Sequence, residues 1–157
     1  MRLWNSIKRW ALKGSEETQN VSIKSTDYHP KIILAWKACI EGNVNIINWL
    51  KENDYLEIVK ATTAFFDHDE SRYWLVDNGY PQLMAFINAC EGDKNASAWL
   101  LNFDFDQFHY MAKAVNEDDF AWEWVKNNCT EDIHLLCQAI LEAKRKIEAN
   151  TSFSPFS

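Results

Sequence analysis

A Trp-Leu or Trp-Val pair recurs at a regular interval along the chain. Trp49-Leu50, Trp74-Leu75, Trp99-Leu100 and Trp124-Val125 each follow the previous pair by 25 residues. A fixed interval of this size is typical of repeat proteins, in which every unit forms one supersecondary element. The interval divides the chain into units that start at residues 31, 56, 81, 106 and 131.

Each unit begins with an apolar pattern of helical spacing. Positions 3, 6, 9 and 10 of every unit are apolar; in the third unit they are Leu83, Phe86, Ala89 and Cys90. This spacing predicts a helix of about three turns with one buried face. The pattern places Asn88 on the exposed side of that helix. Position 9 is small in all units, which lets neighbouring helices approach closely: Cys39, Ala64, Ala89, Ala114 and Ala139.

A polar turn and a second helix complete each unit. Gly42-Asn43 and Gly92-Asp93 combine a helix-stopping glycine with a residue that caps the next helix. The second helix is predicted from about position 14 to position 22, with the Trp pair buried in the core. The fifth unit has no Trp pair, so it predicts a C-terminal capping helix over 131–149, followed by a disordered tail over 150–157.

The first 30 residues do not follow the repeat. Leu3, Trp4, Ile7 and Trp10 predict a basic amphipathic helix that ends near Gly14. Such a helix either caps the first unit, which is the favoured interpretation, or lies on a membrane surface. The rest of 1–30 is predicted to be a polar linker.

These elements together predict the fold class. Glycine and proline are scarce and apolar/polar alternation is rare, so strands are not expected. A single unit is too short to bury its apolar face alone, and stacked units must therefore share a core. We expect an all-α fold, an α-solenoid of stacked antiparallel helix pairs over 31–149 with N- and C-terminal capping helices.

Two units resemble a known family. Residues 34–50, from Leu34-Ala35-Trp36 to Trp49-Leu50, resemble the helix pair of an ankyrin repeat, as does the third unit with Ala89-Cys90-Glu91-Gly92-Asp93. Ankyrin units are about 33 residues long and carry a Thr-Pro-Leu-His start and a projecting β-hairpin finger, which this chain lacks. The resemblance implies an ankyrin-like, hairpin-less stack of helix pairs with a protein-binding role.

Charge and cysteine usage limit the possible partners. The net charge is −7; residues 1–30 carry +2, so the remainder carries −9. An acidic body disfavours nucleic acid and anionic membranes, and favours a protein with a basic or mixed surface. The four cysteines form no C-x-x-C pair and follow no secretory leader, which predicts buried free thiols and a cytoplasmic protein.

The sequence contains few candidates for catalytic or metal chemistry. It has no phosphate-binding loop, nucleophile elbow or H-E-x-x-H motif, so we expect no enzyme, no cofactor and no metal site. Residues 67–70 (Asp-His-Asp-Glu) offer metal ligands, but a solvated turn is the favoured interpretation. His109 and His134 share position 4 of adjacent units and are interpreted as ordinary histidines, although a ligand groove with Tyr110 is an alternative.

The predicted function is a protein–protein interaction module, a helical-repeat scaffold or adaptor. Its binding surface would combine a concave face, made of positions 4 and 5 of the first helices, with a ridge of carboxylates along the turns within each unit. The residues assigned to partner binding are Asp67, His68, Asp69, Glu70, Asp93, Glu117, Asp118, Asp119, Met84, His109, Tyr110 and His134. Two alternatives stay open, an acidic inhibitor or immunity-type protein that neutralises a basic enzyme, and an enzyme with an unrecognised site.

Overall fold

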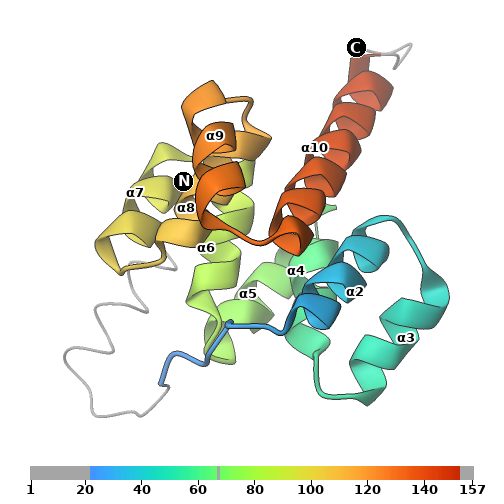
Figure 1. Ribbon diagram of the computed structural model, residues 1–157. Coiled ribbons are helices and arrows are strands. Elements are labelled where there is room, and N and C mark those ends of the chain that lie inside the picture. The colour runs from blue at the N-terminus through green and yellow to red at the C-terminus, as the bar shows by residue number, and fades with distance from the viewer. Residues whose placement is uncertain (1–21, 67, 153–157) are drawn as a thin grey trace.

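The chain is a series of short helices joined by tight turns (Figure 1). The computed structural model describes residues 22–66 and 68–152, and in these ranges it contains no strand. The helices are α2 (Pro30–Ile40), α3 (Val44–Glu52), α4 (Leu56–Phe65), α5 (Asp69–Asp77), α6 (Pro81–Cys90), α7 (Lys94–Asn102), α8 (Asp106–Val115), α9 (Asp119–Asn128) and α10 (Glu131–Ser152). We call α2, α4, α6, α8 and α10 the inner helices and α3, α5, α7 and α9 the outer helices.

The helix boundaries follow the repeat. Inner helices α4, α6, α8 and α10 begin at residues 56, 81, 106 and 131, and α2 begins one residue before 31. Each outer helix packs against the inner helix that precedes it, and successive inner helices pack against one another. The fold is therefore all-α, with helix pairs stacked as in a solenoid, as the sequence predicts.

The C-terminal helix α10 packs against α2. Helix α10 contacts α8 and α9 and also lies along α2, so the two ends of the repeat array meet (Figure 1). This contact is not predicted by the repeat, which relates only neighbouring units. Helix α10 is also longer than expected. It continues to Ser152, so residues 150–152 are helical rather than part of a tail, while 153–157 lie outside the described residues.

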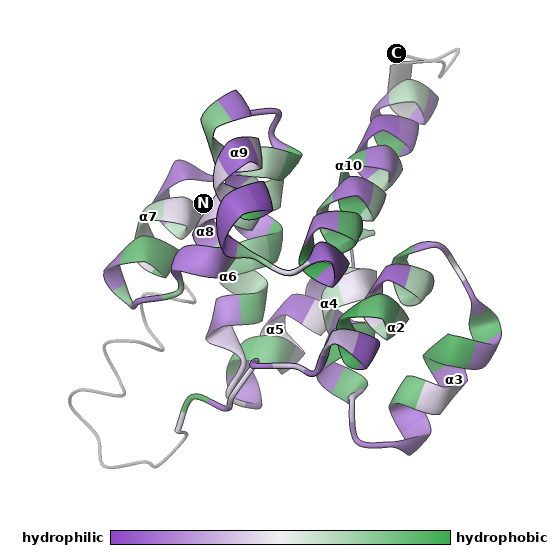
Figure 2. Cartoon of the chain, in the orientation of Figure 1, coloured by the Kyte–Doolittle hydropathy of each residue, from purple (hydrophilic) through white to green (hydrophobic). Residues whose placement is uncertain are grey.

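The core consists of the predicted apolar positions. Positions 3, 6, 9 and 10 of all five inner helices are buried, and Figure 2 shows the hydrophobic and hydrophilic residues of the helices. Position 6 is fully buried in every unit: Trp36, Ala61, Phe86, Met111 and Leu136. Because these side chains interlock across all units, the repeats share one core.

Helix α6 has no exposed face. It packs against α4, α5, α7 and α8, and every one of its residues from Pro81 to Cys90 is buried. The prediction that Asn88 is exposed is therefore wrong. Its side chain accepts a hydrogen bond from the buried Arg72 guanidinium. Helix α6 is nearly apolar all round, which is the pattern of a helix surrounded by other helices.

The segment before α2 is ordered against the repeats. Residues 22–28, here called the strap, belong to no helix or strand and run as a drawn-out segment along the starts of α4 and α6 (Figure 1). The Lys24 amide donates to Gly79 O at 2.9 Å, and the Tyr28 hydroxyl donates to Glu57 Oε1 at 2.9 Å. The polar linker of the sequence prediction thus includes a segment with specific contacts. The predicted N-terminal helix lies outside the described residues.

Candidate interaction surface

The repeated tryptophan stacks on an aromatic residue in the turn that ends its unit. Trp74 and Tyr80 lie 6.4 Å apart between ring centroids and are inclined by 8°, and Trp99 and Phe105 lie 5.9 Å apart at 9°. The residue after each repeated Trp, such as Leu100, is fully buried, but of the four repeated tryptophans only Trp99 is buried, and Trp49 is 43% exposed. The prediction of a buried Trp column is therefore wrong for the first unit, because its ring covers the closing turn instead of entering the core.

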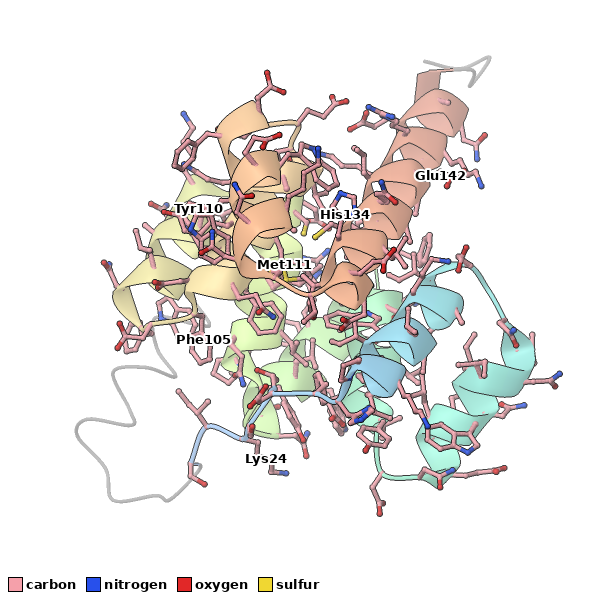
Figure 3. The ribbon with its side chains drawn as sticks, in the orientation of Figure 1. Lys24, Phe105, Tyr110, Met111, His134 and Glu142 are labelled. Atoms are coloured by element: carbon pink, nitrogen blue, oxygen red, sulfur yellow. The ribbon has the colours of Figure 1, made fainter. Side chains whose placement is uncertain are left out.

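The fourth unit departs from this arrangement. Position 25 is Thr130 there, so no ring follows Trp124 in the closing turn. Trp124 stacks instead on Tyr110 of α8, with centroids 4.2 Å apart and planes inclined by 20°. Phe120 lies 6.4 Å from the same tyrosine ring and is 70% exposed. Three aromatic side chains thus meet on the outside of α8 and α9, and Figure 3 shows Tyr110 between α7 and α9.

Two carboxylates border these rings. Glu123 follows Phe120 by three residues on α9 and therefore lies beside it on the helix surface, and Asp119 lies beside Glu123, four residues before it. Glu123 also pairs with Lys126 at 3.6 Å, but both side chains are mostly exposed and such pairs are weak. We call Tyr110, Asp119, Phe120, Glu123 and Trp124 the acidic–aromatic surface.

The predicted carboxylate ridge serves partly as helix caps. Asp93 accepts hydrogen bonds from the amides of Asn95 and Ala96 at the start of α7, at 2.9 and 3.1 Å. Asp118 accepts from the Ala121 amide at 2.9 Å at the start of α9. These contacts satisfy amides that have no partner within the helix, so the two aspartates stabilise their helices.

Cations from other elements interrupt the ridge. Arg145 of α10 pairs with Glu117, and Arg72 of α5 pairs with Glu91 at 2.5 Å. Neither cation belongs to a turn, so this edge carries less negative charge than the residues of the turns alone indicate. Arg72 lies 3.8 Å from Asp69 as well.

Three of the predicted binding residues lie around a pocket. His68, Asp69 and Glu70 are exposed at the start of α5 and line a hollow of about 450 Å³ together with Lys51 and Lys60. Asp67 lies outside the described residues. The mixed charges of this pocket do not select one ligand class.

The predicted concave face is not an open surface. Met84 is fully buried in α6, so the prediction that it is exposed to a partner is wrong; α4, α5, α7 and α8 surround it. His109 is buried and its Nδ1 lies 2.8 Å from the carbonyl of Ser97. His134 is half-buried, with its ring 5.3 Å from that of Trp122 (Figure 3). The two histidines therefore pack on separate outer helices, α7 and α9.

Three of the cysteines are buried in the helix stack. Burial raises the pKa of the Cys39, Cys90 and Cys137 thiols, so these side chains remain protonated at neutral pH. Within 22–66 and 68–152, no group of three or more His, Cys, Asp or Glu side chains is placed to hold a metal ion.

Two residues that matter for the structure were not singled out by the sequence pattern. Arg72 occupies position 17, where other units have Ile47, Ser97 and Trp122. Phe120 occupies position 15, where other units have Asn45, Glu70 and Asn95. In both cases the signal in the sequence is a departure from the residue type that the other units have at that position.

Comparisons of this chain with protein-family models, with curated proteins and with solved structures give no match. In the described part of the chain, none of the helices combines the length and the apolar character needed to cross a membrane.

Proposed function

We propose that this protein is an interaction module that binds a basic segment of another protein through its acidic–aromatic surface. The stacked helix pairs hold that surface rigidly, and the resemblance of the first and third units to ankyrin helix pairs supports a protein-binding role. Asp119 and Tyr110, which the sequence assigns to two separate surfaces, belong to one surface here.

The exposure of Phe120 is the observation that carries the proposal. Its side chain is 70% exposed, although the same position is polar in the other units. An exposed phenylalanine contributes little to the stability of the free protein, whereas its burial by a partner is worth about 1.5–3 kcal/mol. Aromatic side chains that are exposed in the free protein and surrounded by polar residues are typical centres of protein interfaces.

The neighbouring groups indicate the chemistry of the partner. A guanidinium or ammonium group stacks favourably on aromatic rings, and Asp119 and Glu123 offer carboxylates to the same cation. Arginine fits best because it can stack and form two hydrogen bonds to a carboxylate at once. The net charge of −7 further attracts a basic partner during encounter. A basic enzyme that the module inhibits is the alternative partner.

The test compares two exposed apolar side chains. Full-length wild type, Phe120→Ala and Val44→Ala are immobilised, and proteins captured from cells of the source are quantified. Val44 is 65% exposed on α3, outside the acidic–aromatic surface, so it controls for loss of exposed apolar area. We expect at least one basic protein to be lost with Phe120→Ala alone, and the purified protein to bind about tenfold more weakly to that variant.

Two results would contradict the proposal. One is a set of captured proteins that responds equally to both substitutions. The other is a purified partner whose affinity does not change when Glu123 is replaced by Gln or when the salt concentration is raised, because a cationic segment must respond to both.

A further inference from the structure

The repeats recognise the backbone of the strap. Lys24 donates its amide hydrogen to Gly79 O at 2.9 Å, and its own carbonyl oxygen accepts from Gln82 Nε2 at 2.7 Å. Two hydrogen bonds to the main chain of one extended residue resemble the way in which peptide-binding proteins hold an extended ligand. Side-chain contacts flank them. The Lys24 ammonium lies 5.4 Å from the centre of the Tyr80 ring.

The glycine at position 79 is explained by the strap. Asp54 and Asp104, at the same place in the first and third units, have φ of 65° and 63°, so a side chain is compatible with this turn. Gly79 has φ of 90°, and a Cβ built on it would lie 3.0 Å from the carbonyl oxygen of Ser22. Only glycine lets the strap backbone approach so closely.

Buried polar groups line the strip under the strap. Gln82 is fully buried, and its Oε1 has no hydrogen-bond partner in the part of the chain that the structure describes. Glu57 is 5% exposed and accepts a hydrogen bond from the Tyr28 hydroxyl. Burying a carboxylate and an amide is unfavourable unless they meet a partner, and a hydrophobic residue, such as Ile32 at the same position of the first unit, would fill the space. Glu57 and Gln82 therefore favour a covering segment that offers them hydrogen-bond partners.

The Tyr28 side chain is the most specific contact. Its ring lies 6.3 Å from that of Tyr55 in an edge-on arrangement, and burial raises its pKa, as does the neighbouring Glu57 carboxylate. The hydroxyl therefore keeps its proton and donates to Glu57. Residues 23–27 of the strap also line a pocket of about 540 Å³ together with Asp106 and Gln107 of α8.

We infer that the starts of α4 and α6 form a groove for an extended, tyrosine-containing peptide of a partner protein, which the strap occupies in the free chain. The groove is separate from the acidic–aromatic surface, so a failure of one proposal leaves the other unaffected. Because the strap is tethered, its effective concentration at the groove is in the millimolar range, so it excludes a free peptide until it is released. The strap is thus an internal competitor.

The probe is a fluorescent peptide with the sequence of residues 22–30, and its binding to the full-length chain is followed by anisotropy. Tyr28→Phe in the protein removes the hydrogen bond to Glu57 and weakens the strap. A hydrogen bond to a charged group is worth at least about a factor of ten, so we expect that variant to bind the peptide at least about tenfold more tightly than wild type. The same peptide with phenylalanine in place of tyrosine is the matched control and should bind about tenfold more weakly.

A second variant guards against misfolding of the first. Lys24→Ala removes an exposed ammonium from the Tyr80 ring without disturbing Glu57, so it should raise peptide affinity in the same direction by a smaller factor. The inference is overturned if neither variant binds the peptide more tightly than wild type, or if both peptides bind equally. A peptide-sensitive dimer of Tyr28→Phe would support the groove and name a second copy as its occupant.

Hydrogen exchange tests the role of Gly79 without any ligand. Gly79→Ala and Gly92→Ala both place a side chain at a positive φ, of 90° and 95°, but nothing lies within 4 Å of a Cβ at Gly92. We expect the Lys24 amide to exchange at least about tenfold faster in Gly79→Ala and at the wild-type rate in Gly92→Ala. Equal exchange in the two variants would show that Gly79 serves only the turn.

Discussion

Arg72 of α5 donates a hydrogen bond to Glu91 Oε1, 2.5 Å from its Nη2, in the turn that joins α6 to α7. The same guanidinium donates to the carbonyl of Ala64 at 2.9 Å, near the end of α4, and to Asn88 Oδ1. Arg72 is 1% exposed. One side chain thus connects three elements of the second and third units, and it neutralises a carboxylate on the predicted acidic ridge.

Replacement of Arg72 should destabilise the protein strongly. Arg72→Ala leaves the buried Asn88 side chain and the Ala64 carbonyl without their donor, so we expect a loss of about 3–5 kcal/mol in the free energy of unfolding. Glu91→Gln should cost about 1 kcal/mol or less, because the Glu91 side chain is 44% exposed and the other two acceptors of Arg72 remain. Urea denaturation measures both, and similar losses would contradict a central role for Arg72.

The small residues at position 9 predict a second stability effect. Ala89 is 2% exposed inside the helix stack, so Ala89→Leu has no space and should lower the free energy of unfolding by about 1–3 kcal/mol. Ala98 is exposed on α7, and Ala98→Leu should change the free energy of unfolding by about 0.5 kcal/mol or less. Equal melting temperatures of the two variants would contradict the assignment of position 9 to the interior.

The periodicity of the sequence predicts the helices well because each of them depends on local signals. The Trp pair marks the outer helix, and Asn43 or Asp93 marks its start by a cap that acts within three residues. The predictions for Met84 and Asn88 are wrong because their burial depends on the helices of the neighbouring units. A helical pattern identifies the face that packs within the repeat, but it does not reveal that other elements cover the opposite face of α6.

The candidate site was predicted less well than the fold. The sequence assigns Asp119 and Tyr110 to separate surfaces. The packing of α8 on α9 places the Phe120 ring, next to Asp119 in the sequence, near the Tyr110 ring. Glu117, Asp118 and Asp119 are exposed, yet Arg145 reaches Glu117 from a helix that starts fourteen residues later. Charge neutralisation of this kind depends on tertiary contacts, which a repeat alignment does not contain.

The buried thiols predict a loss of stability in alkaline solution. Burial raises the pKa of Cys90 and Cys137 above the ordinary value of 9.0, since the folded chain disfavours the thiolate. Their contribution to stability is complete below pH 9 and is lost as the pH rises, because the unfolded chain releases protons that the folded chain retains. We expect the free energy of unfolding to fall above pH 9 by up to about 1.4 kcal/mol per pH unit for each thiol.

Urea denaturation between pH 7 and 10.5 measures this slope. The double variant Cys90→Ala/Cys137→Ala should show a shallower decline than wild type, even though it starts from a lower stability because of the cavities it creates. Parallel curves for the two proteins would show that other groups cause the alkaline loss.

Asp93 and Asp118 allow capping and electrostatic steering to be separated. Each accepts amide hydrogens at a helix start, and asparagine caps about as well as aspartate, whereas alanine costs about 1 kcal/mol. Asp93→Asn/Asp118→Asn should therefore keep the melting temperature of wild type, while the double alanine variant should melt several degrees lower.

The asparagine variant nevertheless lacks two negative charges near the acidic–aromatic surface and the turn edge. If these charges attract a basic partner, the association rate of the asparagine variant should fall at low salt and approach that of wild type at 1 M salt, where the screening length is about 3 Å. Stopped-flow binding to the partner identified with Phe120→Ala measures this rate, and equal rates for wild type and the asparagine variant at low salt would leave these two aspartates with capping as their function.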